Sequence, residues 1–371
     1  MIAKSMIWFL LLILIPDLYI GIRYLRKRKW WWQVLWYLPG VALMVATCLL
    51  ARERDFVPDD MSGLNLYLLL MGLIAVPKLA FSLCSLCGKH GWKVGLALIP
   101  VLWFVLLYGS FIGNRRFEVK HVEIALSDLP ASFDGYRIVH FSDIHTGTID
   151  SLLLKQAIDS INAQEADMIA FTGDIQNKQP QEIMPYKELL TTLKAKDGVF
   201  SVLGNHDYPD YVELPPFEAS MNEEKTIVHQ MDMGWNILLN GHRFVRRGQD
   251  SIAIAGMEND GEGRFPAKGN INNALWGLDR GTFVVMLEHD PSSWRRKILK
   301  HCHAQLTLSG HTHGMQFELF GWSPLACVKK ECDGLYQIGG RYLYVSKGLG
   351  GVVPFRFGAT PEIVVITLRC K

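Results

Sequence analysis

The chain has 371 residues and a formal net charge of +2, so its bulk charge gives no reason to expect a nucleic-acid partner. Its length leaves room for two or three domains. The mean hydropathy of +0.13 is high for a soluble protein, and the apolar excess lies in the first 113 residues. We therefore expect a transmembrane region over residues 1–113 and a water-soluble domain over residues 114–371.

Four apolar segments in the first part have about the length that a membrane-crossing helix needs, roughly 20 residues. They cover residues 6–22, 31–50, 64–86 and 94–112. A helical bundle in water would show a polar stripe with a period of 3.6 residues, and these segments show little of one. Asp17 and Lys78 interrupt them. Either is a candidate for a functional intramembrane charge, although a place near a helix end, within reach of the headgroups, explains Asp17 more simply.

Basic residues in short loops predict which side of the membrane each loop faces. The densest cluster lies in the first loop and consists of Arg23, Arg26, Lys27, Arg28 and Lys29. We therefore expect this loop to face the cytoplasm. With four crossings of a cell (inner) membrane, everything after residue 112 is then extracytoplasmic.

The seven cysteines show no regular framework and no zinc-finger spacing. Cys327 and Cys332 are close enough in sequence to pair if they meet an oxidising compartment. Free thiols explain them equally well.

Strands alternate with helices after residue 114, which predicts an α/β layered domain. Predicted strands cover residues 117–126, 136–141, 168–171, 199–203, 236–239, 283–287, 304–308, 341–346 and 362–368, with a hairpin over 244–255. Predicted helices cover residues 152–162, 182–193, 218–231 and 294–300. Residues 258–270 are rich in glycine, asparagine and charge, without periodicity, and are predicted to form a loop.

Five of the predicted strands end in polar side chains that offer nitrogen or oxygen donors. These are Asp143 and His145, Asp174, Asn205 and His206, His289, and His311 and His313. Each cluster alone has an ordinary explanation, such as a turn former or a surface histidine. Ligands of α/β sheets bind beyond the carboxyl ends of strands, so five such ends can meet at one site.

The donor types indicate the chemistry of this site. A set of Asp, His and Asn without thiolate suits Mn, Fe or Zn. Even seven of these side chains are more ligands than one ion needs, whereas two ions bridged by one carboxylate would use all seven. Such a pair stabilises both the attacking and the leaving oxygen at phosphorus and lowers the pKa of a bound water. The residues therefore predict metal-assisted hydrolysis of a phosphate ester or anhydride.

In chain order the motifs resemble the signature of the calcineurin-like metallophosphoesterases. They are Asp143-x-His145, Gly173-Asp174, Gly204-Asn205-His206-Asp207, His289 and Gly310-His311-Thr312-His313. The resemblance spans residues 122–368 and is strongest to a membrane-associated bacterial branch that includes UDP-2,3-diacylglucosamine pyrophosphatases and exported phosphodiesterases. Met315 departs from the pattern, because the family has glycine there.

The resemblance implies a four-layer α-β-β-α sandwich with two divalent metal ions at its edge. It implies that Asp143, His145 and His313 hold the first ion, and that Asn205, His289 and His311 hold the second. Asp174 would bridge both ions, with a hydroxide as nucleophile.

The same resemblance implies two residues that act without binding metal. His206 would face the scissile phosphate and stabilise charge or protonate the leaving oxygen, and Asp207 would orient His206.

Membrane helices in the same chain favour a phosphorylated, lipid-linked or envelope substrate, because they hold the enzyme close to the bilayer. Arg243, Arg246, Arg247 and Lys347 are candidates for contact with phosphate, although each also reads as a surface charge. Two alternatives are a broad phosphodiesterase or nucleotidase on soluble substrates, and a non-catalytic scaffold. The scaffold should have lost ligands, and every ligand position here is filled.

Overall fold

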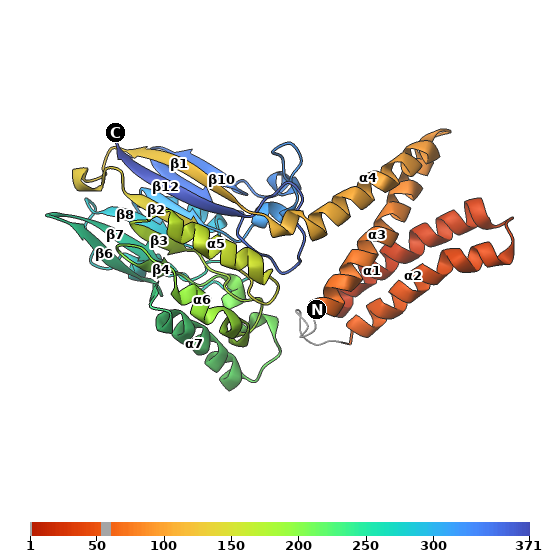
Figure 1. The fold of residues 1–371 in the computed structure, drawn as a ribbon, viewed down its shortest axis with the longest axis horizontal. Helices are drawn as coiled ribbons and strands as arrows, with labels where there is room; N and C mark the ends of the chain where they lie inside the picture. The colour runs from red at the N-terminus through yellow and green to blue at the C-terminus, as the bar shows by residue number, and fades with distance from the viewer. Residues whose placement is uncertain (1, 53–60) are drawn as a thin grey trace. The chain divides into compact units, whose positions relative to one another are not determined.

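The first part of the chain forms four long apolar helices in the computed structural model, which describes residues 2–52 and 61–371 (Figure 1). They are α1 (Ile2–Ile20), continued by a π-helical turn (Gly21–Leu25), α2 (Trp30–Leu50), α3 (Met61–Leu86) and α4 (Gly91–Phe111). All four are long and apolar enough to cross a membrane, as predicted. Each has an internal proline: Pro16, Pro39, Pro77 and Pro100.

Asp17 and Lys78 form an ion pair between α1 and α3. Their charged atoms are 2.6 Å apart, and their side chains are 3% and 12% exposed, respectively. The Asp17 side chain is therefore held by Lys78 rather than left exposed. A charge within a bilayer is costly unless it is paired, and Lys78 compensates for it.

The second unit, Gly113–Lys371, contains two six-stranded sheets. In spatial order, the first has β1 (Glu118–Leu126), β12 (Glu362–Cys370), β2 (Arg137–Phe141), β3 (Met168–Phe171), β4 (Val199–Ser201) and β5 (Asn236–Ile237). The second has β10 (Gly334–Ile338), β11 (Arg341–Val345), β9 (Leu306–Ser309), β8 (Phe283–Leu287), β7 (Asp250–Gly256) and β6 (Gly241–Arg247). Strands β2 to β5 are mutually parallel, as are β7, β8, β9 and β11.

Side-chain alternation along the strands creates three apolar layers. In β8, Val285 packs into the core between the sheets, whereas Val284 and Met286 pack on the outer face with Trp294. On the first sheet, Val139 faces outward and contributes to a core with the helices. Strands buried on both faces need this continuous apolar sequence.

Helices cover the sheets and confirm the predicted α-β-β-α arrangement. They are α5 (Ser151–Ala163), α6 (Lys187–Thr191), α7 (Pro216–Asp232), α8 (Ile271–Ala274) and α9 (Leu299–His301), the last preceded by a π-helical turn (Trp294–Ile298). Figure 1 shows α5 and α6 lying along the first sheet.

Two local predictions differ from the structure. The predicted helix over 182–193 is a 3-10 helix (Pro180–Tyr186) followed by the short α6, because Pro185 interrupts regular helical hydrogen bonding. Strand β10 was not predicted, since it is a largely exposed edge strand. Its signal was the Gly339-Gly340 pair, whose positive φ angles of 57° and 85° match a two-residue hairpin turn.

All seven cysteines are free, including Cys327, which is exposed, and Cys332, which is buried. The conditional disulfide between these two residues is therefore not formed in this structure.

Candidate metal centre

The five polar clusters follow strands whose carboxyl ends point the same way within each sheet. Strands β2, β3 and β4 are parallel neighbours in the first sheet, and β8 and β9 are parallel neighbours in the second. The loops after these five strands carry all the predicted donors: Asp143, His145, Asp174, Asn205, His289, His311 and His313. Parallel pairing therefore brings residues far apart in sequence to one edge of the sandwich.

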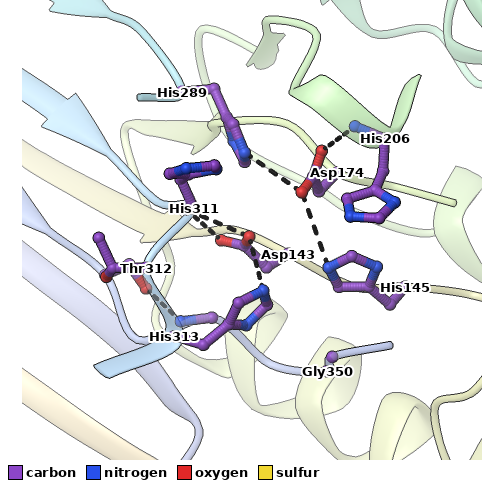
Figure 2. A network of polar contacts seen from close by, with 12 residues as sticks. Asp143, His145, Asp174, His206, His289, His311, Thr312, His313 and Gly350 are labelled. Carbon is purple, nitrogen blue, oxygen red and sulfur yellow. Dashed lines mark hydrogen bonds and ion pairs between the residues drawn. The ribbon is translucent and has the colours of Figure 1, made fainter. Parts of the chain in front are cut away.

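The donors form two groups at that edge (Figure 2). One consists of Asp143, His145 and His313, and the other of Asp174, His289 and His311; within each group the donor atoms lie within 4.8 Å of one another. Such spacing matches what a metal ion needs from its ligands.

Asp174 belongs to the second group and also faces the first. Its Oδ2 atom is 3.2 Å from His289 Nε2 and 3.7 Å from His145 Nε2. Asn205 completes the second group, because its Oδ1 atom is 2.7 Å from His311 Nδ1 and 3.1 Å from His289 Nε2. The structure thus brings together all seven of the predicted ligands.

Hydrogen bonds orient two of the imidazoles toward the centre. His145 Nδ1 is 3.0 Å from Asn177 Oδ1, and its buried Nε2 atom has no hydrogen-bond partner in the described part of the chain. His289 Nδ1 donates to the Thr172 carbonyl at 2.6 Å. Metal-binding histidines characteristically donate their second ring N–H to an oxygen acceptor, so this arrangement fits a metal centre.

The electrostatics also fit metal binding. Burial lowers the pKa of His145 to about 3 and that of His311 to about 4, which keeps both imidazoles in the neutral, ligating form. Burial also lowers the pKa of His289, but Asp174 and Asp143 outweigh it and raise this pKa to about 10. Burial raises the pKa of Asp143 to about 6. A metal ion must therefore displace a proton from His289.

Five of the seven donors have left-handed backbone conformations. Their φ angles are 54° at Asp143, 53° at His145, 59° at Asp174, 73° at His311 and 53° at His313. Non-glycine residues pay about 1–3 kcal/mol for such conformations and keep them where function requires them. The strain here is concentrated on the residues that form the centre.

The loop after β9 is tight at two positions, Gly310 and Met315. A Cβ atom on Gly310 would lie 2.3 Å from Asp143 Oδ2, so only glycine fits beside that carboxylate. Met315 has φ of 56°, a conformation that favours glycine, and its side chain is 56% exposed. The departure from the family pattern therefore adds backbone strain but removes no donor.

His206 lies at the centre but outside both donor groups. Its Nδ1 atom is 2.6 Å from the Asn177 carbonyl, and its backbone N–H donates to Asp174 Oδ1 at 2.7 Å. Its ring stacks on Tyr211, with 3.9 Å between centroids. The Nε2 atom is thus the ring nitrogen left to face a ligand.

Among the described residues, the Asp207 carboxylate bonds to the backbone rather than to the His206 ring, so its predicted role in orienting His206 stays a prediction. This buried carboxylate accepts hydrogen bonds from the backbone N–H groups of Gly204 and Asp174 at 2.8 Å and of Ile175 at 2.9 Å. Asp207 therefore joins the loops after β3 and β4, and the Asn177 carbonyl holds the ring. The sequence motif around Asp207 could not predict these hydrogen bonds, because they connect two loops that are separate in sequence.

Four supporting residues were not predicted: Thr172, Asn177, Tyr211 and Arg356. The buried Arg356 donates to the carbonyls of His313 at 3.0 Å and Gly350 at 2.5 Å, which fixes the loop after β9. Tyr211 accepts a hydrogen bond from Asn205 Nδ2 at 2.5 Å. None belongs to the quoted motifs, although Asn177 follows Asp174 by three residues.

Two of the predicted phosphate contacts are engaged elsewhere. Lys347 is buried and pairs with Glu318 and Asp333, and Arg247 pairs with Asp197 at 2.6 Å. Arg243 and Arg246 are exposed on the edge strand β6. These positions do not single out a substrate contact.

Arg264, in the loop over 258–270, is an exposed residue whose charge reaches the site. Burial is the largest cause that lowers the pKa of His206, and the charge of Arg264 also lowers it. The adjacent Phe265 contacts the His311 ring edge-on, with 5.0 Å between centroids. A segment without periodicity thus forms one side of the centre.

Comparison with known proteins agrees with this geometry. A family model described as calcineurin-like phosphoesterase matches residues 136–315. The chain is 32% identical over 276 residues to the uncharacterized metallophosphoesterase YkuE of Bacillus subtilis, covering 71% of this chain and 89% of that protein. It is 30% identical over 289 residues to a Danio rerio transmembrane protein with metallophosphoesterase domain, covering 74% of this chain and 62% of the relative, which is less than two thirds of its length.

A solved structure, the phosphopantetheinyl hydrolase of Mycobacterium tuberculosis, is 13% identical with a TM-score of 0.38, covering 57% of this chain and 89% of that one. A score this low supports no argument about function. The sequence relatives suffice: the chain belongs to the calcineurin-like phosphoesterases. It is a membrane protein with a metal-dependent phosphoesterase domain.

Replacing Asn177 with alanine should weaken metal binding about 10–100-fold, because His145 loses the oxygen that orients its ring. Metal titration of the purified chain, followed by bound-metal analysis, would measure this. The matched control is Asn272→Ala, an exposed asparagine on α8. Unchanged metal affinity in Asn177→Ala would contradict the role of Asn177.

Proposed function

We propose that this protein is a membrane-anchored hydrolase with a dinuclear metal centre that cleaves a phosphodiester or diphosphate bond. The observation that carries the proposal is that Asp174 faces both groups of donors, within 3.2 Å of His289 and 3.7 Å of His145. One carboxylate shared by two groups of nitrogen and oxygen ligands suits two divalent ions, with Mn, Fe and Zn as the candidates.

The first ion would be held by Asp143, His145 and His313, and the second by Asn205, His289 and His311. When bound, the two ions would stabilise charge on the phosphate oxygens and lower the pKa of a water that attacks phosphorus.

His206 would supply the part of the reaction that the metal ions do not, which is charge stabilisation or proton donation at the phosphate. Its Nδ1 atom is fixed by the Asn177 carbonyl, which leaves Nε2 directed to the reacting group. In its protonated form this nitrogen can stabilise negative charge on the phosphate or donate a proton to the leaving oxygen. Stacking on Tyr211 restricts the ring to this orientation.

The proposed substrate is lipid-linked or otherwise part of the cell envelope. Four apolar helices in the same chain support this, since anchoring raises the effective concentration of membrane-borne phosphates near the enzyme. A broad phosphodiesterase or nucleotidase that acts on soluble substrates is the alternative.

The experiment is hydrolysis by the full chain in detergent after metal removal with a chelator. Mn, Zn, Fe or Mg is restored separately, and the substrates are a chromogenic phosphodiester, a phosphomonoester and a lipid-linked sugar diphosphate. Activity should return with metal and disappear in Asp174→Ala. His206→Asn should lose about 10²–10⁴-fold in kcat and retain its bound metal.

The control is Asp159→Ala, which removes an exposed carboxylate from α5 and should leave activity unchanged. Preference for soluble diesters or nucleotides would favour the alternative substrate class. A folded, metal-loaded protein that hydrolyses none of these substrates would contradict the proposed reaction.

We also propose that the catalytic domain is extracytoplasmic, which the basic residues of the first loop, Arg23 to Lys29, support. Cys327 in this domain and Cys87 after α3 are both exposed, so each can report its side of the membrane. In intact cells, a membrane-impermeant maleimide should label a variant that retains only Cys327. A variant that retains only Cys87 should be labelled only after permeabilisation, and the reverse pattern would contradict this orientation.

A further inference from the structure

The membrane helices line a partly open cavity that has no part in the proposed hydrolysis. It has a volume of about 630 Å³, and its walls come from all four helices. The lining is almost entirely apolar and aromatic, with Leu35, Ile74, Phe81 and Ile99 among its residues. Ligand pockets commonly have volumes of roughly 300–1,000 Å³ and combine such walls with a few polar groups.

Proline chemistry builds one wall of this cavity. Pro77 has no N–H, so the carbonyl of Leu73, one helical turn earlier, loses its usual donor. The indole N–H of Trp103 on α4 donates to this carbonyl at 2.9 Å. Since Leu73, Pro77 and Trp103 all line the cavity, this hydrogen bond joins the walls that α3 and α4 contribute.

The cavity has few polar groups, and the positive charge of Lys78 is neutralised by Asp17. Lys78 lines the cavity, pairs with Asp17 at 2.6 Å and lies 4.4 Å from the centre of the Trp36 ring. Trp36 also lines the cavity, and its buried Nε1 atom has no hydrogen-bond partner in the described part of the chain. An indole N–H only donates, so it requires an acceptor.

We propose that this cavity binds the acyl chain of a membrane glycerolipid, with the ester carbonyl oxygen accepting the Trp36 hydrogen bond. The apolar walls suit the hydrocarbon, and the carbonyl supplies an acceptor at the start of the chain. An anionic group suits the cavity less well, because Asp17 already neutralises Lys78 and another charge would be uncompensated. The inference goes beyond the hydrolase reaction and does not depend on it.

The probe is a phosphatidylcholine with a diazirine in its acyl chain, added to the full chain in detergent micelles. After illumination, cross-linked peptides are identified by mass spectrometry. Cross-links should be enriched at Leu73 and Ile74 relative to Phe104, which is 61% exposed on α4 and serves as the lipid-facing reference. Equal labelling of cavity and reference positions would overturn the proposal.

Competition with unlabelled lipids tests whether the ester carbonyl accepts a hydrogen bond from Trp36. Ester-linked phosphatidylcholine should displace the cavity cross-links about 2–10-fold better than its ether-linked analogue, the range expected for one neutral hydrogen bond. Both lipids should compete equally at the reference position. Equal competition in the cavity of the unmodified chain would overturn the carbonyl assignment.

Two variants separate packing from hydrogen bonding. Ile99→Trp places a larger side chain in the cavity and should reduce its cross-links, whereas Phe104→Trp on the same helix should leave the cavity cross-links unchanged. Trp36→Phe keeps an aromatic ring beside Lys78 but removes the N–H, so the preference for the ester should decrease. Hydrolysis is not part of the readout, so failure of this proposal is distinguishable from failure of the proposed reaction.

Discussion

The buried carboxylate of Asp174 is the charge on which the arrangement of the whole centre depends. Burial alone would raise its pKa, but His289, His206 and His145 lower this pKa well below its ordinary value. Its Oδ1 atom accepts the backbone N–H of His206, and its Oδ2 atom faces both donor groups. An ionised carboxylate in a dry site requires such compensation, and divalent cations would provide more of it.

The two-sheet architecture places that carboxylate. Asp174 comes from the first sheet, whereas His289 and His311 come from the second, so the centre exists only when the sheets pack together. The apolar core between the sheets, which includes Ile138 and Val285, holds them in this relation. Asp207 then joins the β3 and β4 loops through backbone N–H groups. The apolar core and the backbone hydrogen bonds of Asp207 therefore hold the donor side chains in position.

Periodicity was enough to predict an α/β layered domain, and the polar ends of the strands indicated the donor residues that the structure brings together. The two-sheet sandwich and the assignment of donors to two ions followed from the family resemblance. Strands β3 and β8 are short, buried and apolar, so their ends could be located from sequence. The supporting residues could not be predicted, because Asn177 contacts His145 and His206 from a separate loop and Arg356 acts through carbonyls of distant loops. The edge strand β10 lacked an apolar pattern, and the ion pair of Asp17 with Lys78 depends on helix packing that periodicity does not specify.

The most direct test of the central claim is a count of metal ions at the centre. Crystals of the chain loaded with Mn or Zn should show two anomalous peaks on opposite sides of Asp174. One should lie beside Asp143, His145 and His313, and the other beside Asn205, His289 and His311. A single peak, or none with the side chains ordered, would contradict a dinuclear centre.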